Sequence, residues 1–168
     1  SGGPAVADEL FSAPSDLTLA SDTDLTELET RAVAEFERVN GLDNVDTVLA
    51  NAFDYLRNLE KEKAKFDLII LDPPAFAKSR SSVEQAYKGY KEINLRAMRL
   101  LNRGGILVSC SCSYWFDEHR FETMVEDAAF DCGRRIRLIE ARTQDMDHPI
   151  VSGYGESKYL KCRIMELR

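Results

Sequence analysis

Phe66-Asp-Leu-Ile-Ile-Leu-Asp-Pro-Pro-Ala-Phe76 is the stretch of this sequence that decides the fold. Its first six residues form a nearly unbroken apolar run, which predicts a buried strand of a parallel sheet covered on both faces. Asp72-Pro73-Pro74 must end that strand, because two consecutive prolines fix φ and remove two backbone donors. The stretch therefore predicts a strand followed at once by a rigid loop that begins with a carboxylate.

Helix and strand patterns alternate on both sides of this stretch. Apolar residues spaced three to four apart predict helices, and short apolar or alternating runs predict strands. The expected helices cover about residues 4–12, 25–39, 52–59, 85–101 and 117–132. The expected strands cover about residues 17–21, 45–49, 66–71, 105–111, 135–141 and 158–166. This alternation indicates an α/β fold, a mostly parallel sheet with helices on both faces.

Composition restricts the class of protein. The 168 residues are 44% hydrophobic and 30% charged, which suits one globular domain over residues 1–168 and excludes a low-complexity chain. No run of about 18 apolar residues occurs, so we expect no membrane contact. The four cysteines are not dense enough for a disulfide framework, and we expect free thiols in a cytoplasmic protein.

Charge is unevenly distributed along the chain. The net charge is −7, with fourteen acidic and four basic residues in 1–62 but seven basic and three acidic residues in 72–105. An acidic half and a basic middle fit a protein that presents one edge to a polyanion. Ordinary solvated helix faces give the same pattern, so charge alone does not select a nucleic-acid partner.

Residues that follow the expected strands are the candidates for ligand binding, because ligands of parallel sheets lie beyond the carboxyl ends of the strands. Asp22 follows the strand at 17–21 and could bind the hydroxyls of a nucleotide ribose, or cap the next helix. Asn51 follows the strand at 45–49. Its side-chain oxygen could accept a hydrogen bond from an adenine amino group, or it could equally be a helix cap.

The loop after residue 71 is the stronger signal. Pro73 and Pro74 leave carbonyl groups without competing N–H donors beside Asp72, which suits a planar base that carries an amino group. Phe76 could stack on such a base, or it could belong to the core. Lys78 lies in the same loop and could contact phosphates.

Cys110-Ser-Cys-Ser113 ends another expected strand. Alternation puts Cys110 and Cys112 on one side of that strand, with Cys112 nearer the open end. Cys112 is either a nucleophile or a small buried hydrophobe. We expect no metal site, because the other cysteines and both histidines are isolated in the sequence. His148, in Asp147-His-Pro149, could be a base, an RNA contact or a turn residue without a role.

Together these stretches resemble class I S-adenosylmethionine-dependent methyltransferases, most closely the bacterial large-subunit ribosomal RNA cytosine-C5 methyltransferase family I. The resemblance runs from about Leu19 to the C-terminus. It is carried by residues 66–79 with Asp-Pro-Pro-Ala-Phe, 89–97, 102–113 with Ser-Cys-Ser, and 147–149. It implies a Rossmann-like sheet, mostly parallel with an antiparallel last strand, S-adenosylmethionine as cofactor and ribosomal RNA as partner.

The resemblance also implies roles for individual residues. Cys112 would be the nucleophile that adds to carbon 6 of a cytosine, so that carbon 5 can attack the methyl group. Asp72 would hold that cytosine and lie at the cofactor. The other cofactor residues would be Gly2, Gly3, Asp22, Asn51 (where the family usually has Asp) and Ala52. We expect the RNA to contact Pro73, Pro74, Phe76, Lys78 and His148.

The start of the chain departs from the family pattern. Ser1-Gly2-Gly3 resembles only the tail of the glycine-rich cofactor loop, and the first central strand that precedes this loop in the family is absent. The family's N-terminal RNA-binding region is absent too. The resemblance therefore implies an N-terminally truncated catalytic domain of a longer enzyme. Whether it forms a homo-oligomer is left open.

Two other function classes remain open. Asp-Pro-Pro followed by an aromatic residue also holds amino groups in adenine-N6 or guanine-N2 methyltransferases, in which case Cys112 only packs. A non-catalytic remnant that binds RNA or a protein partner is the second alternative. A dinucleotide oxidoreductase is disfavoured, because the sequence has no complete G-x-G-x-x-G.

Overall fold

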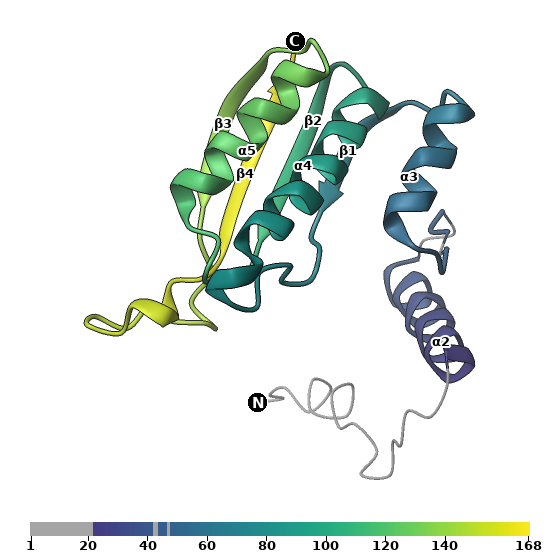
Figure 1. The fold of residues 1–168 in the computed structure, drawn as a ribbon. Coiled ribbons are helices and arrows are strands. Elements are labelled where there is room, and N and C mark those ends of the chain that lie inside the picture. The colour runs from purple at the N-terminus through teal and green to yellow at the C-terminus, as the bar shows by residue number, and fades with distance from the viewer. Residues whose placement is uncertain (1–21, 42–43, 47) are drawn as a thin grey trace, which may run out of the picture. The chain divides into compact units, whose positions relative to one another are not determined.

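The computed structural model describes residues 22–41, 44–46 and 48–168, with side chains described from residue 30 onward (Figure 1). The chain divides into two compact units, Ser1–Leu49 and Ala50–Arg168. The predicted helix at 4–12 and the predicted strand at 17–21 lie outside the described residues. The structure therefore tests the predicted elements from residue 22 onward.

The described part of the first unit is mainly helix α2 (Asp22–Asn40), which confirms the helix predicted over 25–39. The strand predicted at 45–49 is not found, because residues 45, 46, 48 and 49 lie in no strand. Val48 and Leu49 are 59% and 60% exposed. A strand here would bury no apolar face, and the Val45 N–H instead donates to a carboxylate oxygen of Glu37.

The second unit contains a four-stranded sheet in the order β1-β2-β4-β3. The strands are β1 (Phe66–Leu71), β2 (Leu101–Ser111), β3 (Ile136–Arg142) and β4 (Lys161–Leu167). β1 pairs with β2 in parallel, whereas β4 is antiparallel to both β2 and β3. Three strands thus share one direction and the last strand runs against them, as predicted.

Helices α4 (Val83–Leu100) and α5 (Glu118–Asp131) lie over one face of this sheet (Figure 1). Helix α3 (Ala52–Lys61) packs against α4, and two short 3-10 turns cover Arg80–Ser82 and Gly155–Ser157. The core lies between the helices and the sheet. Its largest fully buried side chains are Tyr90, Phe116, Phe121, Met98, Leu107, Met124 and Met165.

The opposite face of β1 is less covered than the sequence predicted. Ile69 and Leu71 pack against the core, but Leu68 and Ile70 are 54% and 63% exposed. An unbroken apolar run indicates that both faces of the strand carry apolar side chains, but it does not identify the segments that cover each face. Helices on both faces of the sheet are therefore not found among the described residues of this unit.

β2 begins earlier than predicted. Residues 102–104, which lie between the predicted helix and the predicted strand, belong to β2 and bulge from it. Phe66 pairs with Leu101 while Leu68 pairs with Ile106, so the extra residues leave the ladder between these two pairs. Gly104 has φ of +81°, a backbone conformation that glycine adopts without strain.

Candidate active site

Two loops meet at the carboxyl edge of the parallel pair β1 and β2. Leu71 pairs with Ser109, so the loop that starts at Asp72 and the segment Ser111–Ser113 leave the sheet side by side. The Cys112 thiol lies 3.9 Å from the carbonyl oxygen of Pro73 and points toward it as a weak donor. The geometry thus brings together two stretches that the sequence analysis singled out separately.

A buried tyrosine of α4 joins these loops. Ser111 Oγ donates to the Tyr90 hydroxyl over 3.0 Å, and Ser113 Oγ lies 2.8 Å from the same hydroxyl. The Phe76 N–H donates to the Tyr90 hydroxyl over 3.4 Å, and the Ala77 N–H donates to Ser113 Oγ over 3.1 Å. Tyr90 is fully buried, so this network fixes one loop relative to the other.

The two cysteines at the end of β2 have different surroundings. Cys110 pairs with Cys162 across the β2–β4 ladder. Burial, followed by a side-chain interaction with Cys162, raises the pKa of Cys110 to about 12, so this thiol stays protonated at neutral pH. Both thiols are partly exposed, but Cys112 lies one step beyond the end of β2, at the edge of the sheet where the loop after Asp72 begins.

Lys161 supplies a buried cation beside Cys112. Its Nζ donates to the carbonyl oxygens of Ser113 over 2.6 Å and of Tyr159 over 2.8 Å. Burial lowers the pKa of Lys161 to about 8, whereas the charge of a thiolate at Cys112 acts to raise it. The ammonium group is thus held within electrostatic reach of the Cys112 sulfur.

A cavity of about 420 Å³ lies beside Asp72. Its walls come from the start of α3, the end of β1 and the loop that follows β1. Six of the predicted site residues line this cavity: Asn51, Ala52, Asp72, Pro73, Pro74 and Phe76. The remaining walls are mostly apolar, so the cavity combines a largely hydrophobic surface with a few polar groups, as small-molecule sites do.

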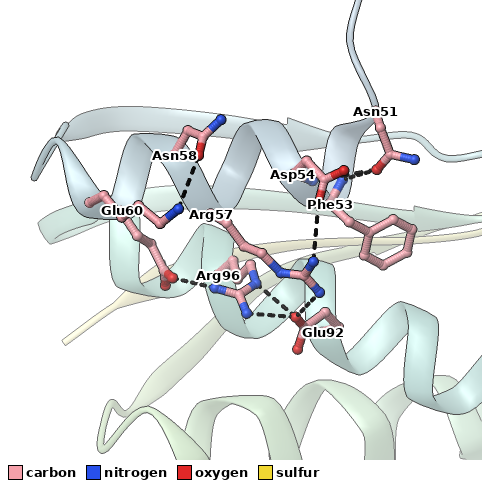
Figure 2. A network of polar contacts seen from close by, with 9 residues as sticks. Asn51, Phe53, Asp54, Arg57, Asn58, Glu60, Glu92 and Arg96 are labelled. Carbon is pink, nitrogen blue, oxygen red and sulfur yellow. Dashed lines mark hydrogen bonds and ion pairs between the residues drawn. The ribbon is translucent and has the colours of Figure 1, made fainter.

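Asn51 is the N-cap of α3. Its side-chain oxygen accepts from the Phe53 N–H over 3.0 Å and from the Asp54 N–H over 3.4 Å. The oxygen predicted to accept from an adenine amino group is therefore engaged by the helix, while the amide nitrogen points away from it (Figure 2). Ala52 is the first residue of α3, and a backbone N–H at this position has no acceptor within its own helix.

Charged side chains hold α3 against α4 (Figure 2). Arg96 of α4 forms ion pairs with Glu92, 2.6 Å away, and with Glu60 of α3. Arg57 of α3 reaches Glu92 over 3.2 Å. The hydrogen bond from Arg96 lowers the pKa of Glu92, so this carboxylate stays charged well into acidic conditions. The network positions Asn51 and Ala52 at the cavity.

Phe76 is part of the packing rather than a free ring. Its centroid lies 4.5 Å from that of Tyr90 and 6.1 Å from that of Phe53. A Cβ atom at Gly89 would meet the Phe76 ring at 3.2 Å, so α4 approaches this ring as closely as a glycine permits. Phe76 therefore packs against the core and also lines the cavity.

Other predicted residues are not brought to this cavity. Lys78 is exposed and lines none of the cavities described for this chain. His148 is exposed in the loop after β3, where its Nδ1 lies 3.1 Å from a carboxylate oxygen of Asp147. Asp22 is the first residue of α2, and its side chain is outside the described part, as are Gly2 and Gly3.

Sequence reasoning missed Tyr90, Ser113 and Lys161 as members of the site. Tyr90 lies in the apolar spacing of α4, a pattern that indicates a core residue and nothing more. The partners of its hydroxyl are 14, 21 and 23 positions away in the sequence, so no local pattern reveals them. Lys161 follows an ordinary alternating pattern in β4, and its burial depends on the strand order β2-β4.

Among the side chains that the structure describes, no group of three or more histidine, cysteine, aspartate or glutamate residues is arranged to hold a metal ion. None of the described helices is long and apolar enough to cross a membrane.

Proteins of similar sequence carry a common name. No model of a known protein family matches the sequence. The chain is 39% identical over 154 residues to "Ribosomal RNA large subunit methyltransferase I" of Shewanella denitrificans, which covers 90% of this chain and 39% of that protein. It is 41% identical over 132 residues to the protein of the same name from Klebsiella pneumoniae, covering 76% and 33%. The chain thus spans about two fifths of the length of these relatives or less.

Solved structures agree on the fold. A crystal structure of a methyltransferase complexed with SAH matches with a TM-score of 0.68 and 22% identity, covering 82% of this chain and 36% of that one. A methyltransferase homologue from Pyrococcus horikoshii matches with a TM-score of 0.56 and 16% identity, covering 83% and 50%. The chain therefore has the α/β, Rossmann-like methyltransferase fold predicted from its sequence.

Proposed function

We propose that this protein transfers a methyl group from S-adenosylmethionine to carbon 5 of a cytosine in ribosomal RNA. The observation that carries the proposal is the position of the Cys112 sulfur. It lies 3.9 Å from the carbonyl oxygen of Pro73, which belongs to the loop that starts at Asp72. The names of the relatives support methylation of ribosomal RNA as the reaction class. Such a substrate would place the reaction in the cytoplasm.

The cavity beside Asp72 fits an adenosyl group. Its volume of about 420 Å³ and mostly apolar walls suit a planar base, and its polar side chains are Asn51 at the start of α3 and Asp72 directly after β1. The Ala52 N–H would donate to an adenine ring nitrogen, because this N–H has no partner within the helix. The Asn51 side chain would lie at the same helix end, with its oxygen held by the α3 cap and its amide nitrogen left to donate to an acceptor of the ligand.

Cys112 would act as the nucleophile. S-adenosylmethionine, when bound, supplies an electrophilic methyl group. The Cys112 thiolate would form a bond to carbon 6 of the cytosine, which makes carbon 5 electron-rich enough to take that methyl group. Carbon 5 then loses its proton and the sulfur leaves carbon 6, so the aromatic ring and the free cysteine are both restored.

Asp72 and Lys161 would control charge during this sequence. Asp72 would hydrogen-bond to N3 or the amino group of the cytosine and orient the ring, and a proton shared between Asp72 and N3 would offset the negative charge that the thiolate brings into the ring. The Lys161 ammonium, fixed by the Ser113 and Tyr159 carbonyl oxygens, would supply positive charge to the Cys112 thiolate. Neither role requires a metal ion.

Product analysis separates this proposal from its alternatives. The protein is incubated with ribosomal RNA and S-adenosylmethionine carrying a labelled methyl group, and the RNA is digested to nucleosides. We expect the label in 5-methylcytidine, its loss in Cys112→Ala, and its retention in Cys132→Ala, which changes a partly buried cysteine at the end of α5. Label in methylated adenosine or guanosine would instead support an amino-group enzyme. No label in any RNA would support a binding role alone.

A further inference from the structure

A second cavity, of about 660 Å³, lies on the other flank of the Cys112 loop. It shares no lining residue with the cavity beside Asp72. Two adjacent aromatic side chains, Tyr114 and Trp115, line it directly after Ser113. They are 42% and 40% exposed, and their ring centroids are 5.3 Å apart in an edge-to-face arrangement. The proposed function assigns no role to this aromatic pair.

The aromatic pair stands on a rigid support. Ser113 before it belongs to the Tyr90 network, and Phe116 after it is fully buried with its centroid 4.9 Å from that of Tyr90. Both ends of the short segment are therefore fixed in the core. Two large rings are held at the surface of a cavity, where a planar ligand can stack without first ordering the protein.

Cationic side chains surround the rings. The Arg80 guanidinium lies 5.9 Å from the centroid of Trp115 and forms no ion pair among the described residues. Arg120 and Lys158 also line the cavity and pair with its acids Asp117 and Glu118. These pairs engage two of the three acids that line the cavity, the third being Glu84, and Arg80 remains available to an added anion.

We propose that this cavity binds a single-stranded nucleotide next to the target cytosine, with its base stacked on Trp115 and its phosphate at Arg80. Aromatic rings beside unpaired guanidinium groups are the combination that recognises unstacked RNA bases. Trp115 lies three positions after Cys112, a span of at most about 11 Å, so both bases would belong to one short stretch of the RNA strand. The placement beside the target rests on the proposed function, but the binding itself does not.

Trp115 is the sole tryptophan of the chain, so its fluorescence reports on this cavity alone. The full chain is titrated with a short single-stranded oligoribonucleotide that contains cytosine, and with a duplex of the same sequence. We expect saturable quenching by the single strand, weaker quenching by the duplex, and the same result in Cys112→Ala. Because that variant lacks the proposed nucleophile, failure of the chemistry and failure of this site give different results.

Affinity measurements with variants complete the test. Trp115→Ala should weaken binding of the oligonucleotide about tenfold, the loss expected for one stacked base, and Trp115→Phe should recover part of it. Arg80→Ala should weaken binding and reduce its dependence on salt. The control is Tyr154→Ala, which removes a 56% exposed ring outside the cavity and should change neither value. Unchanged affinity in Trp115→Ala, or equal quenching by duplex and single strand, would overturn the proposal.

Discussion

The hydroxyl oxygen of Tyr90 lies 2.8 Å from Ser113 Oγ, although 23 residues separate them in the sequence. Through this contact one buried side chain of α4 holds the segment that contains Cys112. The same hydroxyl accepts from the Phe76 N–H and so holds the loop that contains Asp72. The distance between the proposed nucleophile and the proposed base-binding carboxylate thus depends on a residue that touches neither ligand.

Removal of the Tyr90 hydroxyl should therefore affect the reaction more than cofactor binding. Tyr90→Phe keeps the ring contacts with Phe76 and Phe116 but leaves buried hydroxyl and N–H groups unpaired, which should cost about 1–3 kcal/mol in the free energy of unfolding. We expect kcat to fall about 10- to 100-fold because the loops lose their relative position, with little change in the Kd for S-adenosylmethionine. Urea unfolding, methylation kinetics and cofactor titration give the three values.

Tyr87→Phe is the matched control for that change. The Tyr87 hydroxyl donates to an Asp127 carboxylate oxygen over 2.6 Å, between α4 and α5 and away from both loops. Its removal should lower stability by about 1 kcal/mol and leave kcat unchanged. A similar loss of kcat in both variants would mean that Tyr90 acts only through overall stability.

Substitutions at Asn51 should separate its cap from its role in cofactor binding. Asn51→Asp keeps an oxygen for the α3 cap and supplies a second oxygen to accept from the adenine amino group. We expect the Kd for S-adenosylmethionine to fall about three- to tenfold, the effect of roughly 1 kcal/mol, with stability unchanged. Asn51→Ala should lose about 1 kcal/mol of stability and bind the cofactor more weakly. Weaker binding in Asn51→Asp would show that the amide nitrogen is the group in contact.

The ion pairs between α3 and α4 should make the protein sensitive to acid. Because Arg96 lowers the pKa of Glu92 in the folded state, the pairs contribute fully above the unfolded pKa of glutamate, about 4.3. Their contribution is lost as the pH falls through the lower folded pKa. Glu92→Gln should lower the free energy of unfolding by about 1–2 kcal/mol at neutral pH, a value between those for exposed and buried ion pairs. In strong acid the variant and the unmodified protein should have the same free energy of unfolding.

Chemical denaturation at several pH values measures this difference. Glu140→Gln is the control, because Glu140 and Arg142 form an ion pair on the exposed surface of β3. It should produce no measurable change at any pH. A loss for Glu92→Gln that stays constant down to strong acid would contradict the assignment of the stabilisation to the charged form of Glu92.

Much of the fold could be predicted because its signals are local. The apolar run before Asp72 and the apolar spacings of α4 and α5 are each visible within a short window, and the structure agrees with all three. The strand at 45–49 was wrong, because a short apolar run does not identify a partner strand. β2 starts at Leu101 rather than at residue 105 as predicted, because Gly104 and Gly105 lie in a bulge, and glycines mark a bulge and the end of a strand alike.

The candidate site could be predicted only in part. The six residues of the cavity beside Asp72 follow strands or begin a helix, so the rule that ligands bind at the carboxyl edge of a parallel sheet was sufficient to find them. Tyr90 and Lys161 could not be found in this way. Their importance comes from hydrogen bonds to Ser113, and these exist only once α4, β2 and β4 are packed together.

Covalent trapping tests the identity of the nucleophile most directly. An RNA with 5-fluorocytidine at the target position is incubated with the protein and S-adenosylmethionine, and denaturing electrophoresis detects a protein–RNA adduct. Fluorine cannot leave carbon 5 as a proton does, so the bond from the enzyme to carbon 6 persists. We expect the adduct in the unmodified protein and in Cys110→Ala, whose thiol has a pKa raised to about 12, and none in Cys112→Ala. An adduct that survives in Cys112→Ala would contradict the assignment of Cys112 as the nucleophile.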